Sequence, residues 1–185
     1  MKKILMLLTV VLFAASQLMA QDPSFQKGDN VINLGIGFGS PIYHGTGYKM
    51  AVPPISASYE FCIVDGIAKK GAVGIAPYIG FSSYKWKYGD WGYRYSNIIL
   101  GARGAFHYPF VDKLDTYAGL LLGWRITSVS DIGTIDIENG YNTKSGGFQH
   151  AEFIGARYYF ANNFAGFAEL GYGISWFTFG LSFKF

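Results

Sequence analysis

The chain has 185 residues, with 15 Lys and Arg against 12 Asp and Glu, and this length fits one domain. Only 15% of the residues are charged, whereas 18% are aromatic and 25 are glycine; this composition argues against disorder, a coiled coil and a basic nucleic-acid binder. The single cysteine excludes an internal disulfide and a cysteine-based zinc cluster.

The first twenty residues are typical of a secretory signal peptide. Lys2 and Lys3 precede an apolar run over residues 4–15, and Ala20 is a small residue at the expected cleavage point. The run is too short for a membrane-spanning helix, which needs about 20 apolar residues. Loss of the two lysines lowers the formal net charge from +3 to +1, so charge indicates no acidic partner. We expect a signal peptide at 1–20, a short periplasmic segment at 21–29 and one folded domain at 30–185.

Eight later segments alternate apolar residues with small or polar ones, which is the period of a β-strand. In the first, Ile32, Leu34 and Ile36 alternate with asparagine and glycine, and in the last, aromatic residues and leucine alternate with Thr, Gly, Ser and Lys. The predicted strands are 30–39, 53–64, 73–85, 93–108, 116–128, 148–160, 164–174 and 176–185.

The composition of the polar row indicates where these strands lie. In a soluble barrel or sandwich the polar row faces water and is rich in Lys, Glu and Asp. Here it consists mostly of Gly, Ser, Thr and Ala, which suit the narrow interior of an eight-stranded barrel. The apolar row then faces lipid, and strands of about ten residues are long enough to cross a bilayer. We therefore predict an all-β fold, an eight-stranded antiparallel up-and-down transmembrane β-barrel, in preference to a soluble barrel.

The lengths of the connections predict the orientation of the barrel. The two longest loops, 40–52 and 131–147, follow the first and fifth strands, whereas the connections after the second, fourth and sixth strands have at most seven residues. Short turns lie on the periplasmic side of outer-membrane barrels. We predict an integral protein of the cell outer membrane with both termini in the periplasm.

Charged residues on the inward row are few. Glu60, Arg103, Arg157 and Glu169 stand at similar heights above the periplasmic end, and we expect them to form one paired layer because buried charges persist only when paired. Arg125 and Lys184 also fall on this row. A lumen filled by side chains is favoured for so narrow a barrel, and an ion-selective constriction is the alternative.

One group of residues invites a catalytic hypothesis. Ser128, His150 and Glu152 fall on the outward rows of neighbouring strands near the outer surface, where a lipid A acyl-ester hydrolase would act. The alternative is that these polar residues simply suit the level of the lipid headgroups. The chain also lacks the His-x-Ser pairing of the lipid A deacylase barrels. The three histidines have no metal-binding spacing. We predict no enzymatic activity, no cofactor and no metal.

Three stretches carry a family resemblance: Gly155-Ala156-Arg157-Tyr158-Tyr159-Phe160, residues 168–173 and residues 180–185. Together with the eight segments, they make residues 28–185 resemble the outer-membrane β-barrel domain family, which is related in shape to the OmpX and OmpA barrels and common in Bacteroidetes-type bacteria. The resemblance implies structural, adhesive or secretion-associated roles without selecting one. It also implies a C-terminal signal for the barrel-assembly machinery, carried by Phe177, Phe179, Leu181, Phe183 and Phe185.

The predicted function is that of an integral outer-membrane barrel with a structural or surface-interaction role and a lumen plugged by side chains. Expected partners are outer-membrane lipids and lipopolysaccharide, the barrel-assembly machinery during biogenesis, and an extracellular partner at the outer loops. No nucleic acid is expected, and the barrel is predicted to be a monomer. A lipid A-modifying hydrolase and a narrow small-solute channel remain the alternative functions.

Overall fold

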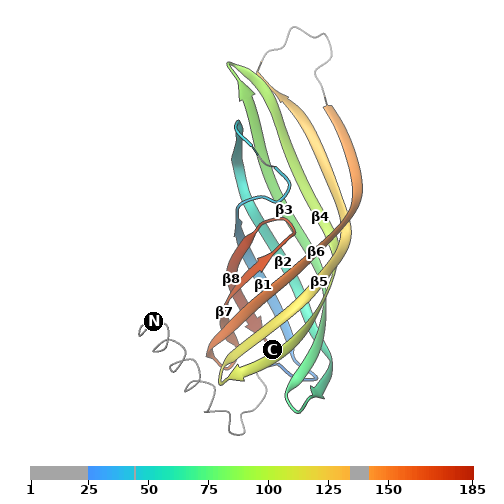
Figure 1. Cartoon of the computed structure of the whole chain (residues 1–185), viewed down its shortest axis with the longest axis vertical. Helices are drawn as coiled ribbons and strands as arrows, with labels where there is room; N and C mark the ends of the chain where they lie inside the picture. The colour runs from blue at the N-terminus through green and yellow to red at the C-terminus, as the bar shows by residue number, and fades with distance from the viewer. Residues whose placement is uncertain (1–24, 44, 134–141) are drawn as a thin grey trace, which may run out of the picture.

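The computed structural model describes residues 25–43, 45–133 and 142–185, so the predicted signal peptide at 1–20 lies outside the described residues. Eight antiparallel strands follow one another around a closed barrel, and β8 pairs with β1 to close it (Figure 1). No helix in the described part of the chain is long and apolar enough to span a membrane. The strands are β1 (Asn30–Phe38), β2 (Tyr48–Ile67), β3 (Gly71–Tyr88), β4 (Trp91–Val111), β5 (Leu114–Ile132), β6 (Asn142–Ala161), β7 (Phe164–Gly171) and β8 (Phe177–Lys184).

Most large apolar side chains lie on the outside of the barrel, whereas the inside holds most of the buried polar side chains together with small apolar clusters. Leu34 and Leu181 are more than half exposed, at 57% and 52%, whereas Asn97, Asp115 and Ser182 are completely buried in the lumen. Successive residues of a strand point to opposite faces, so each strand contributes one row to each environment. This reversal of the usual burial is what a barrel in lipid requires. The predicted eight-stranded transmembrane β-barrel is confirmed.

Five neighbouring strands are longer than predicted and extend beyond the closed barrel. β2 to β6 have between 18 and 21 residues, whereas β1, β7 and β8 have eight or nine. The longer strands continue upward in Figure 1 past the ends of the shorter ones. We call this part the protruding sheet; it consists of residues 48–54, 82–97, 127–132 and 142–152.

The two long loops predicted at 40–52 and 131–147 are therefore shorter than expected. β2 already begins at Tyr48, and β6 begins at Asn142. The prediction was wrong here because both faces of the protruding sheet carry polar or aromatic residues, as in Lys85-Trp86-Lys87. Without an apolar row, the hydropathy of the segment no longer alternates.

Pro53 and Pro54 mark an irregularity in β2. The pairing of β2 with β3 shifts register between Val52 and Ile55, and both prolines lie within this shift. Proline has no N–H to donate to a ladder, so a bulge is one of the few positions in a sheet that tolerates it. β1 pairs with β2 only as far as Ile55. The prolines thus stand where the closed barrel ends and the free edge of β2 begins.

Candidate functional site

A buried cluster of four charged or ionisable side chains fills the lumen near the start of β1 and the end of β8. The Arg157 guanidinium donates to Glu60 Oε2 at 2.5 Å and to Asp115 Oδ2 at 3.2 Å. His107 completes the group, with Nε2 3.0 Å from Glu60 Oε1 and Nδ1 3.0 Å from Asp115. The side chains of Arg157, His107 and Asp115 are at most 1% exposed. We call these four residues the basal cluster.

The basal cluster is built so that its charges balance. Both ring nitrogens of His107 face carboxylate oxygens, which only accept hydrogen bonds. A doubly protonated ring satisfies both contacts, and two cations then face two carboxylates. Because an unpaired charge in such a site costs several kcal/mol, each member depends on the others.

Phe25 covers the basal cluster from the N-terminal side. Its side chain is 1% exposed and packs with Val31, Cys62 and Ala72. Its ring centroid lies 4.4 Å from that of His107. Part of the predicted periplasmic segment at 21–29 is therefore inserted into the base of the barrel, where it excludes water from the ion pairs.

A second ion pair lies beyond the first along the lumen. Arg103 Nη2 donates to Glu169 Oε1 at 2.6 Å, and the Tyr117 hydroxyl donates to the same oxygen at 2.9 Å. The Arg103 guanidinium also lies 3.9 Å from the centre of the Phe153 ring, a cation–π contact. The Tyr117 ring passes over Gly155, where an added Cβ would come within 2.6 Å of it. We call Arg103, Glu169 and Tyr117 the upper cluster; the cavity beside it holds only about 40 Å³.

The four predicted lumen charges therefore form two separate pairs rather than one layer. Glu60 pairs with Arg157, and Arg103 pairs with Glu169. All four residues are paired, but the expected single layer is not formed, because hydrogen-bonded rows in a barrel are staggered around its axis. Of the two remaining inward charges, Lys184 lies 3.4 Å from Asp29.

Three residues of these clusters, His107, Asp115 and Tyr117, were not predicted as site residues. Asp115 was assigned to a turn, although it shares the inward row of β5 with Tyr117. His107 lies within the predicted strand 93–108, but its contacts with Glu60 and Asp115 were not predicted. Extending the alternation of β5 by one residue would have brought Asp115 into the lumen, opposite Arg157 in the register.

The far end of the lumen is occupied by the first loop. Tyr43 donates its hydroxyl proton to Asn97 Oδ1 at 3.2 Å, and Thr127 donates to the same oxygen at 2.9 Å. The Tyr43 ring packs against Tyr48, Tyr84 and Tyr95, with centroids between 4.9 and 5.3 Å apart. The loop after β1 therefore sends an aromatic side chain into the mouth of the barrel.

The residues of the catalytic hypothesis do not come together. Ser128 pairs with Lys144, whereas His150 pairs with Leu122, which lies six residues before Ser128 in β5. At about 3.3 Å per residue, the serine and histidine are on the order of 20 Å apart. His150 and Glu152 remain neighbours, with Nε2 and Oε1 3.8 Å apart, but both side chains are more than half exposed. Neither of the two described histidines, His107 and His150, is placed to act as a base for Ser128.

Two other sequence predictions concern a metal and the C-terminal signal. No group of three His, Cys, Asp or Glu side chains is arranged to hold a metal ion within residues 25–43, 45–133 and 142–185. The last strand turns its alternate side chains toward lipid, with exposures from 37% to 57%. These side chains are the predicted signal residues Phe177, Phe179, Leu181, Phe183 and Phe185.

Comparison with known proteins relates the chain to others by its fold. No family model matches the sequence, and a search of curated proteins found no match. Among solved structures, Ail of Yersinia pestis in complex with the heparin analogue sucrose octasulfate has a TM-score of 0.51 at 11% identity, covering 86% of this chain and 100% of Ail.

Two proteins of Pseudomonas aeruginosa align over similar lengths. The N-terminal β-barrel domain of OprF has a TM-score of 0.48 at 15% identity, covering 86% of this chain and 98% of that domain. The outer membrane protein OprG has a TM-score of 0.47 at 13% identity, covering 89% and 99%. With its closed ring of eight antiparallel strands and its match to Ail, this chain has the fold of the eight-stranded outer-membrane β-barrels.

Proposed function

We propose that this protein is an integral outer-membrane barrel that interacts with an external partner through its protruding sheet. The fold and the apolar outer surface support a place in the outer membrane. The turns at the basal end are short, since β4 ends at Val111 and β5 begins at Leu114. Short turns are periplasmic in such barrels, so in this proposal both termini face the periplasm and the protruding sheet stands outside the cell.

The observation that carries this proposal is the open edge of β6. Among the residues that the structure describes, 142–151 pair with β5 alone, because β7 joins β6 only from Phe153 onward. The Tyr159 N–H bonds to β5, whereas the Glu152 carbonyl accepts from Tyr172 on the other side. By alternation, the N–H and C=O groups of Lys144, Gly146 and Phe148 point away from β5, whereas the outward His150 carbonyl accepts from the Gln149 side chain at 2.7 Å. Such a row of free backbone groups is a template for an added strand.

Proline on this edge is expected to abolish the interaction while leaving the barrel folded. Lys144→Pro with Phe148→Pro removes two N–H groups that point to the free side and spares the ladder to β5. Attachment of cells to one another and to surfaces should fall to the level of a deletion strain. The matched control, Lys144→Val with Phe148→Val, keeps both N–H groups and should attach like the wild type.

Two single-cysteine substitutions test the orientation. A cysteine at Asp90, in the β3–β4 turn, should react with a membrane-impermeant maleimide in intact cells, whereas a cysteine at Asp112, in the β4–β5 turn, should react only after lysis. Cys62 is 8% exposed and serves as the unreactive background. Labelling at Asp112 in intact cells, or normal attachment by the deletion strain, contradicts the proposal.

We further propose that the lumen is plugged. Support comes from the basal cluster under Phe25, the upper cluster, and Tyr43 in the mouth. Wild-type protein in planar bilayers is expected to show no steady ion conductance, because the two clusters and Tyr43 occupy a lumen that is narrow in an eight-stranded barrel. Stable single-channel steps would contradict the plug and favour a narrow small-solute channel lined by the two clusters.

The remaining roles stay proposals of the same kind. We propose no enzymatic activity, supported by the separation of Ser128 from His150 along β5. The outward residues of β8 suit recognition by the barrel-assembly machinery. A monomer is proposed because the ring of strands closes within one chain.

A further inference from the structure

Three basic residues stand side by side on neighbouring strands of the protruding sheet. The register pairs Lys49 of β2 with Lys85 of β3, and Lys85 with Arg94 of β4. Directly paired residues share one face of a sheet, with Cβ atoms about 4.5 to 5.5 Å apart. Lys85 lies four residues from the outward-facing Phe81, so the three side chains point outward. We call Lys49, Lys85 and Arg94 the basic row.

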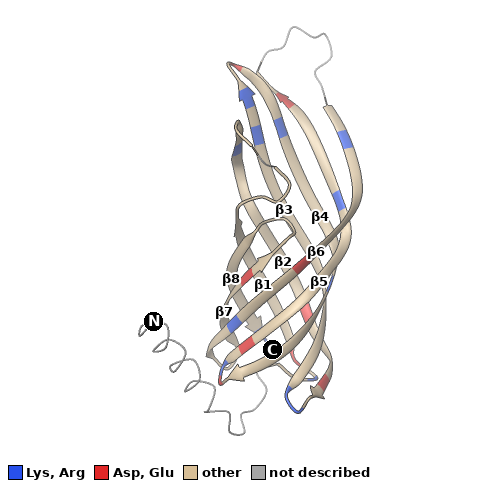
Figure 2. Cartoon of the chain, viewed as in Figure 1, with Lys and Arg blue, Asp and Glu red and all other residues tan. Residues whose placement is uncertain are grey.

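Nothing in the described residues neutralises the basic row. Within residues 25–43, 45–133 and 142–185, none of its members pairs with a carboxylate. The next position in the register after Arg94 is the neutral Ser130. In Figure 2, blue segments mark Lys and Arg on neighbouring strands in the upper part of the barrel, which is the protruding sheet. Like charges directly opposite one another destabilise a sheet, so a bound anion would relieve the repulsion.

The surface changes in steps from apolar to basic along these strands. Phe81 and Ile98 pair in the apolar band, Ser83 and Ser96 pair two residues further on, and the basic row follows after two more. The Ser83 and Ser96 hydroxyl oxygens are 3.3 Å apart. The whole change takes four residues, about 13 Å of strand. Ser83 is only 3% exposed, so the accessible surface passes from the apolar band to the basic row, an order that matches a lipid whose acyl chains lead to phosphate.

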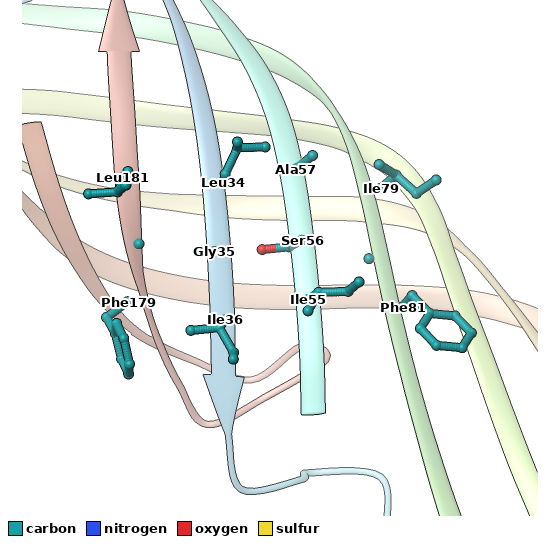
Figure 3. A pocket seen from close by; sticks show the side chains of 12 residues that line it. Leu34, Gly35, Ile36, Ile55, Ser56, Ala57, Ile79, Phe81, Phe179 and Leu181 are labelled. Atoms are coloured by element: carbon teal, nitrogen blue, oxygen red, sulfur yellow. The ribbon is translucent and has the colours of Figure 1, made fainter. Parts of the chain in front are cut away.

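An apolar groove of about 660 Å³ lies in the band next to the basic row. Figure 3 shows two rows of side chains that border it, with Leu34, Ala57 and Ile79 in one and Ile36, Ile55 and Phe81 in the other. Ala57 is the smallest of the six and leaves a dip between its larger neighbours. Phe81 at the border of the groove lies four residues of β3, about 13 Å, from Lys85, so one amphiphile can reach both.

We propose that this groove and the basic row bind a phosphorylated, multiply acylated glycolipid of the outer leaflet, the class to which lipid A belongs. An acyl chain occupies the groove, and a sugar phosphate lies against Lys49, Lys85 and Arg94, because two ammonium groups and one guanidinium match a phosphate.

A second apolar groove provides a contrast. It holds about 750 Å³ on β4 to β8 and includes Ile154. The outward row of β6 continues from Ile154 through Glu152 and His150, which contact each other. The second groove is followed by the acidic Glu152, whereas the first is followed by three basic residues. A lipid with a negatively charged headgroup is therefore expected to prefer the first groove. The inference rests on the proposed function in one respect, that the protruding sheet lies at the outer leaflet.

Native mass spectrometry of the folded full chain in detergent tests the site. The probes are bisphosphorylated lipid A, the same lipid with both phosphates removed, and phosphatidylglycerol. The wild type should bind lipid A at least tenfold more tightly than either other lipid. Lys49→Gln, Lys85→Gln and Arg94→Gln together should weaken lipid A binding at least tenfold. The control triple, Lys27→Gln, Lys69→Gln and Lys113→Gln, removes the same charge at the basal end and should bind like the wild type.

Three results would overturn the proposal. They are equal binding of the dephosphorylated lipid, equal binding of phosphatidylglycerol, and equal losses in the two triple variants. Lys85→Gln alone, at the centre of the row, should weaken binding about threefold and serves if the triple variant does not fold. Cell attachment and cysteine labelling do not depend on these contacts, so a failure here is distinguishable from a failure of the proposed function.

Discussion

Replacing Arg157 by methionine is expected to destabilise the folded barrel by about 3 kcal/mol or more, because it leaves two buried carboxylates facing one histidine. Arg157 donates to both Glu60 and Asp115 and is 1% exposed. Methionine keeps the length of the side chain and removes its charge. The free energy of unfolding is measured by urea titration in detergent, followed by circular dichroism and by heat-modifiable migration in gels.

The control for this change is Arg125→Met. Arg125 is on the inward row of β5 but forms no ion pair with a described carboxylate, so a loss below about 1 kcal/mol is expected. In a double-mutant cycle, Arg157→Met and Glu60→Gln should together cost less than the sum of the single changes, because the two residues are in contact. Strict additivity of the two changes would show that the basal cluster is not a coupled unit.

Replacing Phe25 by alanine is expected to cost about 3 kcal/mol, which is typical of a buried phenylalanine. The ring fills the base of the lumen and packs on His107, so its loss also admits water to the ion pairs. The same urea titration measures the effect.

Phe110→Ala is the matched control for Phe25. Phe110 lies near the same end of the barrel, and its side chain is 56% exposed to the lipid side. It should lose less than about 1 kcal/mol. Equal losses in the two variants would mean that Phe25 contributes only general hydrophobic contact and does not cover the basal cluster.

The barrel could be predicted from the sequence because lipid imposes a simple rule on each strand. Residues such as Leu34 and Ile36 must face outward while Gly35 faces a narrow interior, so the alternation is nearly unbroken within the membrane. Beyond the membrane the rule no longer applies. Segments such as 82–97 stay paired, but their rows no longer differ in hydropathy, which is why the protruding sheet was not foreseen.

The sequence predicts that the lumen contains paired charges, but it does not predict which residues pair with each other. Sequence spacing indicates that Glu60 and Arg103 face inward, and their burial requires counter-charges. Which counter-charge each one meets depends on the stagger of the closed barrel, and the pairs Glu60–Arg157 and Arg103–Glu169 span 97 and 66 residues of sequence. The contribution of Phe25 was equally hidden, because a single aromatic residue before the first strand carries no periodic signal.

The proline pair in β2 makes the two edges of the protruding sheet unequal, with a consequence for self-association. The β6 edge has no proline over residues 142–152, whereas the β2 edge begins at Pro53 and Pro54 and carries Lys49. An open filament needs head-to-tail contacts in which one copy's β6 pairs with the next copy's β2. Proline and lysine obstruct the second of these edges. Any pairing between copies is thus restricted to β6 against β6, a contact with twofold symmetry that closes at two molecules.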